Sequence, residues 1–154
     1  MAVTLQPMPS IDLGPWLEQS KADHIADRVD TGEDPETARL ITNATSERLF
    51  PGGVPAEGQF VFLVTEDATP VGSVWLGAGQ DGPPDVWFLW SIEVDVAARG
   101  HGLGRQSVRL AEEFARKRGA TKLELNVFGN NSVARSLYES LGYRISTIQM
   151  SKVL

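Results

Sequence analysis

The chain has 154 residues, no cysteine and a formal net charge of −6. This length fits one domain with one hydrophobic core. The lack of cysteine excludes disulfides, thiolate nucleophiles and cysteine metal sites, and two widely separated histidines, His24 and His101, give no reason to expect a metal. No stretch reaches the roughly 20 apolar residues of a membrane span, and the N-terminus does not read as a signal peptide. We therefore expect a cytoplasmic protein without a membrane partner.

The negative charge is concentrated in the first third of the chain. Residues 1–58 contain ten acidic and four basic side chains, whereas the remainder contains ten of each. A nucleic-acid partner would favour a basic face, so this distribution argues against one and is compatible with a positively charged acceptor. The alternative is that these carboxylates form the solvated faces of helices.

The N-terminal part is predicted to be mostly helical. Residues 3–6 can form a short strand. The apolar residues between 11 and 29 recur at helical spacing, which predicts one or two amphipathic helices opened by Ser10 or Asp12. A further helical stretch, 36–49, ends at a proline followed by two glycines.

From Gln59 onward the pattern becomes extended. Residues 59–65 and 71–76 predict a hairpin with a five-residue connection. Residues 86–94 are apolar on both faces, as expected of a central strand. Two polar residues interrupt this run on one face: Ser91 and Glu93. The remaining expected elements are a helix at 103–118 ended by Gly119, a strand at 122–128, a turn and helix cap at 129–132, a short helix at 134–141 ended by Gly142, and an extended segment at 143–152.

A glycine-rich turn joins the central strand to the helix that follows. Its sequence is Arg99-Gly100-His101-Gly102-Leu103-Gly104. Such a turn leaves backbone N–H groups bare at the positive end of a helix, where an anion can bind. Glycines allow a ligand to approach the main chain, and Arg99 and Arg105 place cations on either side. We therefore expect a phosphate-bearing ligand. The P-loop pattern fails because its lysine is absent, and the dinucleotide pattern fails because Arg105 stands where it needs glycine.

The turn resembles a motif of the GCN5-related N-acetyltransferase (GNAT) family, Arg/Gln-x-x-Gly-x-Gly/Ala, here Arg99, Gly102 and Gly104. The resemblance extends to two further blocks in the same order, and it covers about Gln59 to Met150. These blocks are Ile92-Glu93-Val94-Asp95 before the turn, and Leu125-Asn126-Val127 with Asn131-x-x-Ala134-x-x-x-Tyr138-x-x-x-Gly142-Tyr143 after it.

This resemblance implies an α/β (α+β) fold with a splayed, mixed, mostly antiparallel sheet flanked by helices on both faces. It implies one domain over residues 1–154, in which residues 1–58 supply the first strand and acceptor-side helices and residues 59–154 bind acetyl-CoA. The pantetheine arm would pair with the main chain of Ile92 and Val94, and Asn131 would contact the cofactor. The diphosphate would lie on the turn formed by Arg99, Gly100, His101, Gly102, Leu103 and Gly104, with Arg105 beside it.

Acetyl transfer to an amine needs a base, an oxyanion donor and a proton for the leaving thiolate. The resemblance places Tyr138 near the cofactor sulfur as general acid; the alternative is a packed helix residue. The N–H of Val94 is a candidate oxyanion donor. Glu93 is our preferred base, because burial on an apolar strand would raise its pKa, although its side chain could instead point to the outer helix layer. Some amino-terminal acetyltransferases of this family carry a glutamate at the position that matches Asn126. An asparagine side chain cannot accept a proton usefully, so Asn126 cannot replace that glutamate as a base.

The sequence thus predicts an acetyl-CoA-dependent N-acetyltransferase that uses a primary amine of a small molecule or peptide. One alternative is a non-catalytic acyl-CoA binding or sensing domain on the same fold. Another is a protein acetyltransferase acting on lysine or on an amino terminus. The sequence is compatible with a homodimer and does not identify the acceptor.

Overall fold

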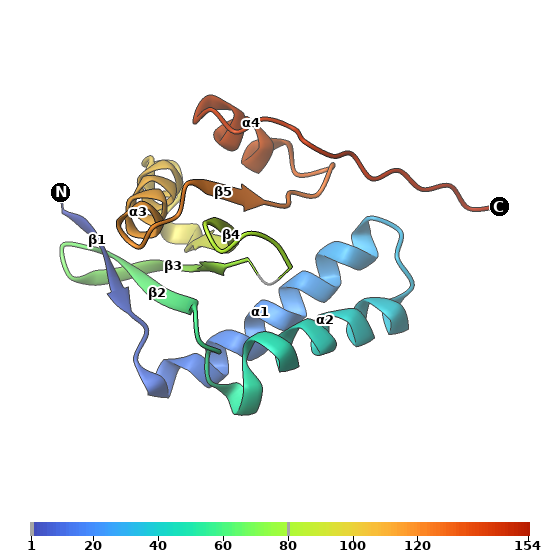
Figure 1. Cartoon of the computed structure of the whole chain (residues 1–154), viewed down its shortest axis with the longest axis horizontal. Coiled ribbons are helices and arrows are strands. Elements are labelled where there is room, and N and C mark those ends of the chain that lie inside the picture. The colour runs from blue at the N-terminus through green and yellow to red at the C-terminus, as the bar shows by residue number, and fades with distance from the viewer. Residues whose placement is uncertain (1, 80) are drawn as a thin grey trace.

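The computed structural model describes residues 2–79 and 81–154; Met1 and Gln80 lie outside them. The elements in chain order are β1 (Val3–Pro7), α1 (Ser10–Asp30), α2 (Pro35–Leu49), β2 (Gln59–Glu66), β3 (Thr69–Ala78), β4 (Val86–Val94), α3 (Leu103–Lys117), β5 (Lys122–Leu125) and α4 (Ser132–Ser140). The strands form one sheet in the order β1-β2-β3-β4-β5 (Figure 1). All neighbours are antiparallel except β4 and β5, which are parallel.

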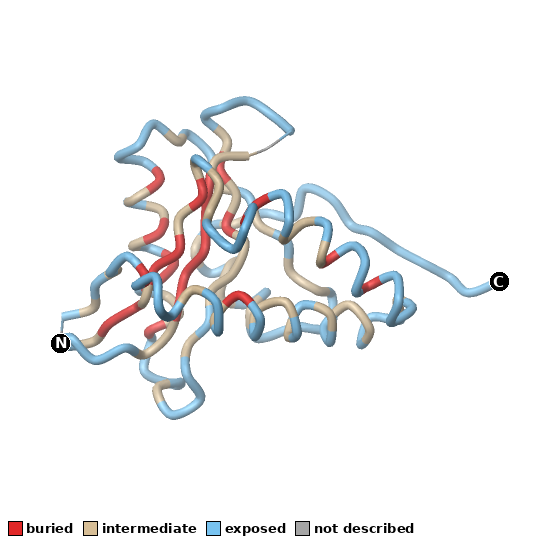
Figure 2. The backbone as a smooth tube through the Cα atoms, turned by 90° about the horizontal axis from the view of Figure 1, so that it is seen from below, coloured by how far each residue is buried: buried red, intermediate tan, exposed pale blue. Residues whose placement is uncertain are grey.

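Helices cover both faces of this sheet. Successive side chains of a strand point to opposite faces, and the inner strands carry apolar side chains on both faces, so each face must be buried. Phe62 and Val74 face α3 in one buried cluster, whereas Val61 and Trp75 join Leu17 of α1 in the other. Figure 2 shows the buried residues gathered along the central strands. The predicted mixed, mostly antiparallel sheet with helices on both faces is therefore confirmed. Among the described residues, no helix is long and apolar enough to cross a membrane.

Two local predictions near the N-terminal half were wrong. The stretch predicted to form one or two helices is one continuous helix, α1, but Pro9 is its N-cap residue and neither Ser10 nor Asp12 caps it with a side chain. The hairpin between β2 and β3 has a two-residue turn, Asp67 and Ala68, instead of five residues. Both turn residues have positive φ, 47° and 69°. Glycine or asparagine usually marks such a turn, so the sequence carried little signal for it.

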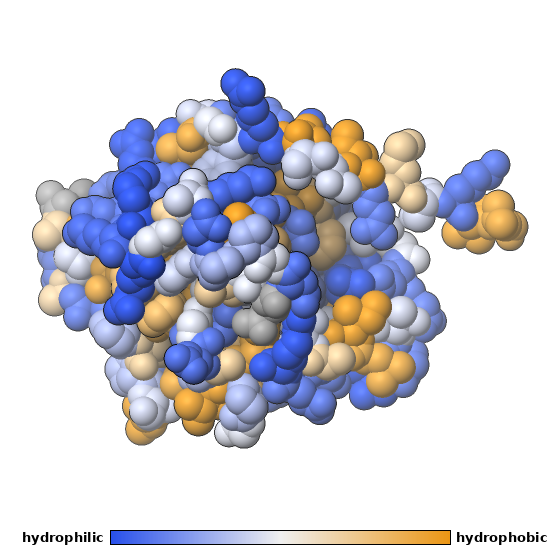
Figure 3. Space-filling view, viewed as in Figure 1, coloured by the Kyte–Doolittle hydropathy of each residue, from blue (hydrophilic) through white to orange (hydrophobic). Residues whose placement is uncertain are grey.

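The C-terminal end also differs from the prediction. Strand β5 stops at Leu125, and the expected extended segment at 143–152 forms no strand. Its apolar residues Ile145 and Ile148 are three positions apart, which breaks the two-residue alternation of a strand. A groove of about 520 Å³ separates β5 from residues 141–146. The final residues project from the body, with Val153 93% exposed (Figure 3).

Gly72 allows β3 and β4 to approach each other closely. It lies opposite Val94, and a Cβ added at this position would collide with the main-chain carbonyl oxygen of Glu93. We expect Gly72→Ala to lower the free energy of unfolding by roughly 2–4 kcal/mol, because backbone atoms must move to make room. Urea denaturation measures this effect. Gly129→Ala is the control, since a Cβ there meets nothing within 4 Å. Equal free energies of unfolding for the two variants would show that β3 and β4 can move apart at Gly72 without loss of stability.

Candidate active site

The site is organised around a gap between β4 and β5. The parallel pairing of these strands ends at Leu89 opposite Leu125, while β4 continues to Val94. The last part of β4 therefore has β3 on one side and no strand on the other. A ligand with amide groups can pair with such an edge as an added strand does.

Hydrogen bonding at the end of β4 fixes which backbone groups face this gap. The N–H of Asp95 donates to the carbonyl of Val71, towards β3. Alternate residues of a strand direct their backbone groups to opposite sides, so the N–H and C=O of Ile92 and Val94 point towards the gap. The Val94 carbonyl accepts a hydrogen bond of 2.9 Å from Nε of Arg99, whereas its N–H remains available there.

The glycine-rich turn presents a run of unbonded amides beside the gap. Gly100 and Gly102 adopt positive φ values of 82° and 76°, and Gly102 is the N-cap of α3 without any side-chain cap. Gln106 donates the first helical bond, to the carbonyl of Gly102. Among the described residues, the backbone N–H groups from Gly100 to Arg105 donate to no acceptor. By contrast, Asp34 caps α2 through its side chain. An anion would satisfy these free donors.

The flanking side chains shape this turn. Arg99 is tied to β4 through the bond to Val94, and Nη2 of Arg105 donates to the hydroxyl of Ser140 on α4 at 2.7 Å. His101 is exposed, with Nδ1 3.3 Å from the carbonyl oxygen of Ala98. Leu103 is only 3% exposed and anchors the start of α3 in the core. The turn is therefore held by its ends while its amides stay open.

Helix α4 borders the same end of α3. A Cβ at Gly104 would lie 3.4 Å from Cδ2 of Leu137, which shows how closely the two helices approach. Asn131 caps α4 by accepting a hydrogen bond of 3.2 Å from the N–H of Ala134. Its side-chain oxygen is thus engaged in helix capping, and its amide N–H groups are what remains for a ligand.

Tyr138 packs from α4 against the cluster on the α3 face of the sheet, which also includes Ile92. Burial raises the pKa of Tyr138, so its phenol stays protonated at neutral pH. Its hydroxyl makes no hydrogen bond to any described residue, unlike that of Tyr143, which donates to Glu112 at 2.9 Å. The phenol of Tyr138 is therefore protonated and has no hydrogen-bond partner in the described parts of the chain.

Glu93 lies on the opposite face of β4, next to α1. Partial desolvation raises the pKa of Glu93, and Asp23 raises it further through its charge and a hydrogen bond between the two carboxyl groups. The positive charge of Arg99 lowers this pKa, and the negative charge of Asp27 raises it by a smaller amount. A carboxyl with a raised pKa is a stronger base when ionised, which suits proton abstraction near neutral pH.

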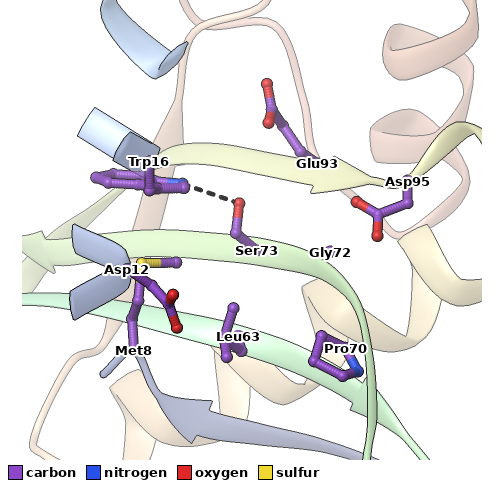
Figure 4. A pocket seen from close by; sticks show the side chains of 9 residues that line it. All are labelled: Met8, Asp12, Trp16, Leu63, Pro70, Gly72, Ser73, Glu93 and Asp95. Atoms are coloured by element: carbon purple, nitrogen blue, oxygen red, sulfur yellow. Dashed lines mark hydrogen bonds between the residues drawn. The ribbon is translucent and has the colours of Figure 1, made fainter. Parts of the chain in front are cut away.

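Glu93 lines a cavity of about 220 Å³ under the start of α1 (Figure 4). Asp12 and Trp16 enter it from α1, Ser73 from β3 and Asp95 from the end of β4. The indole N–H of Trp16 donates to the hydroxyl of Ser73 at 3.1 Å. Apart from Glu93, sequence reasoning assigned none of these residues to a site. The acidic excess in residues 1–58 was the only signal, and it did not distinguish Asp12 or Asp23 from the other carboxylates.

The order of the strands, the separation of β4 from β5 and the open N-terminus of α3 define an acetyltransferase fold. The crystal structure of the putative acetyltransferase YycN from Bacillus subtilis matches with a TM-score of 0.89 and 27% identity, over 99% of each chain. The aminoglycoside N-acetyltransferase AAC(6')-Iy in complex with CoA has a TM-score of 0.62 at 15% identity, over 99% of this chain and 95% of that one. This second likeness is one of fold.

Sequence comparison then gives the family. The profile of the Acetyltransferase (GNAT) family matches residues 23–143. The uncharacterized N-acetyltransferase YycN of Bacillus subtilis (strain 168) is 28% identical over the full length of both chains. The uncharacterized N-acetyltransferase YdgE of the same organism is 33% identical over 70% of this chain and 69% of its own. The chain belongs to the GNAT family, and the resemblance found in its motifs is confirmed.

Proposed function

We propose that this protein transfers the acetyl group of acetyl-CoA directly to a primary amine. The observation that carries the proposal is the run of unbonded amides from Gly100 to Arg105 beside the gap in the sheet. A diphosphate is an anion of the kind such a helix terminus binds, and the two arginines at its ends add positive charge. The CoA complex of AAC(6')-Iy, which shares the fold, is consistent with this assignment.

The residues of the turn hold the donor and those of β4 orient it. The amides bind the diphosphate, while the gap-facing groups of Ile92 and Val94 pair with the pantetheine amides. Bound acetyl-CoA supplies an activated thioester carbonyl. The N–H of Val94 donates to the carbonyl oxygen as negative charge develops on it.

Glu93 and Tyr138 lie on opposite faces of β4 and carry out the two proton transfers of the reaction. Glu93, ionised, takes a proton from the ammonium form of the acceptor, directly or through water, because only the neutral amine can attack. Tyr138 donates its phenolic proton to the departing thiolate. Burial raises the pKa of Tyr138, so its phenol keeps the proton that this role requires at neutral pH.

The proposal is tested by thiol release from acetyl-CoA across a panel of small amines, aminoglycosides and peptides, with mass spectrometry of the acceptor. We expect the release of CoA to match the appearance of an acetylated amine. Tight binding of acetyl-CoA without acetylation of any amine would instead indicate an acyl-CoA binding domain.

The pH dependence of turnover reports on Glu93. Turnover should rise with pH as Glu93 ionises, at a pH above the ordinary range of a glutamate because its pKa is raised. Asp23→Asn removes the charge and the hydrogen bond that contribute to this increase, so it should lower the pKa of Glu93 and shift the acidic limb to lower pH. Asp27, which also raises this pKa, and Arg99, which lowers it, remain unchanged.

The profile of kcat against pH checks this prediction. Asp30→Asn is the matched control, because Asp30 lies on the same helix and is not among the groups that shift the pKa of Glu93. An acidic limb that stays in place in Asp23→Asn, or moves to higher pH, would exclude Glu93 as the base.

A further inference from the structure

The last residues of the chain form a segment that lies outside every helix and strand. Residues 144–154 are all exposed, and the segment leads away from the sheet to the C-terminus (Figure 1). Eleven large apolar side chains are exposed among the described residues, and five of them belong to this segment: Ile145, Ile148, Met150, Val153 and Leu154. Such a concentration of exposed apolar surface in one short segment indicates an interaction site.

Strand β5 has an edge that no strand covers in the described parts of the chain. It is the last strand in the order of the sheet and pairs with β4. The N–H of Lys122 donates to the carbonyl of Asp85, towards β4. Backbone groups alternate in direction along a strand, so the N–H and C=O of Leu123 and Leu125 point to the open edge. These groups can pair with a further strand.

The groove of about 520 Å³ along this edge gives such a strand a place to lie. Strand β5 and residues 141–146 form its sides, and α3 contributes Ala115 and Glu112. Leu123 and Leu125 are half-buried and pack against the buried cluster that contains Ala115. Apolar side chains that enter the groove on this face would therefore extend the cluster beneath α3.

The C-terminal segment contains a sequence that matches this edge. Residues 147–151, Thr-Ile-Gln-Met-Ser, alternate between polar and apolar. As a strand they would place Ile148 and Met150 on one face. Strand β5 alternates in the same way, with Leu123 and Leu125 towards the buried cluster and charged residues at the other positions. Pairing of the two segments would bring four apolar side chains together on the α3 face.

The segment would have to reverse its direction to reach β5 of its own chain with these residues. It borders the groove at residues 141–146, before it reaches Ile148, and Figure 1 shows that it then continues away from β5. A tight reversal is favoured by glycine, proline, asparagine or aspartate, and none of these follows Gly142. Residues 147–151 are therefore better placed to reach the open edge of another molecule.

We propose that two copies of this chain form a dimer by exchange of their C-terminal segments, in which residues 147–151 of each copy pair as a strand with β5 of the other. Each copy has one such segment and one open edge, so a two-fold axis satisfies both contacts and closes the assembly. Ile148 and Met150 enter the groove of the second copy, while Gln149 faces solvent. The proposal does not depend on acetyl transfer.

Sedimentation equilibrium of the full-length protein tests this exchange. We expect the wild type to be a dimer at micromolar concentration. Ile148→Asp places a charge on the apolar face of the segment and should raise the Kd of the dimer by roughly tenfold or more. Gln149→Asp is the matched control, because it adds the same charge to the opposite face and should leave the Kd within about twofold. A monomeric wild type, or the same Kd for both variants, would overturn the proposal.

Cross-linking distinguishes exchange from the return of the segment to its own chain. The natural chain has no cysteine, so a variant with Glu124→Cys and Gln149→Cys carries one thiol on β5 and one on the segment. A short bismaleimide joins two thiols and tolerates a shift in register. We expect it to give a covalent dimer on a denaturing gel.

The control for this experiment combines Gln6→Cys with Gln149→Cys. Gln6 is exposed on β1, at the opposite edge of the sheet, so this pair should give much less covalent dimer. A monomeric product from the Glu124 and Gln149 pair would show that the segment does not lie beside β5 of a second copy. Equal yields of dimer from the two pairs would overturn the proposal in the same way.

Discussion

Replacement of Gly102 by aspartate is expected to weaken acetyl-CoA binding by roughly a hundredfold and to lower kcat/KM by at least as much. The residue is the N-cap of α3, next to the free amides of its first turn. A carboxylate there would accept hydrogen bonds from the amides that the diphosphate needs and would repel its negative charge. The loss of charge-assisted hydrogen bonds, about 1.5–3 kcal/mol each, sets the size of the effect. Isothermal titration calorimetry with CoA measures it.

The matched control is Gly102→Asn. Asparagine has nearly the same shape as aspartate and is among the residues that tolerate a φ of 76°. It can cap the helix but carries no charge, so it should weaken CoA binding much less. Similar affinity of the aspartate variant and wild type would show that the diphosphate binds elsewhere.

Removal of the Tyr138 hydroxyl is expected to lower kcat by 10²- to 10⁴-fold, the usual contribution of a general acid. In Tyr138→Phe the ring still fills its place against the core cluster, so stability and the Kd for acetyl-CoA should change little. The departing thiolate would then have to leave without a proton. A steady-state assay together with CoA titration separates the effect on kcat from one on binding.

The chain offers Tyr143→Phe as a control, since Tyr138 and Tyr143 are its two tyrosines. Their rings lie 5.7 Å apart, yet the Tyr143 hydroxyl is bound to Glu112 on α3. Its loss should reduce stability by about 1 kcal/mol and leave kcat nearly unchanged. If both variants lose activity equally, or if Tyr138→Phe retains full kcat, Tyr138 is not the general acid.

The sequence predicted those helices and strands whose apolar residues follow a clear pattern along the chain. The central strand β4 was predicted with the correct limits, Val86 and Val94, because a run that is apolar on both faces ends where the glycine-rich turn begins. Helix α3 was predicted to within one residue because its apolar residues recur at helical spacing and Gly119 follows its end. The segment predicted to be extended, 143–152, forms no strand, since strand formation depends on a partner edge that the sequence of one segment does not reveal.

One part of the candidate site could likewise be predicted from local sequence, and another part could not. The free amides follow from glycine spacing within one short segment, so sequence analysis could propose an anion site there. The acidic cavity is assembled from residues far apart in the chain, such as Asp12 and Asp95, and depends on how α1 crosses the sheet. The roles of Glu93, Tyr138 and the amides stay predictions until the variants are measured.

The most direct measurement of the central claim is the reaction of the wild-type protein with acetyl-CoA and the panel of small amines, aminoglycosides and peptides, followed by CoA release and by mass spectrometry of the amine. We expect one molecule of monoacetylated amine for each CoA released, and loss of both products in the Gly102→Asp variant. CoA release without acetylated amine, or equal product from Gly102→Asp and wild type, would contradict an acetyltransferase whose donor is held by the turn from Arg99 to Arg105.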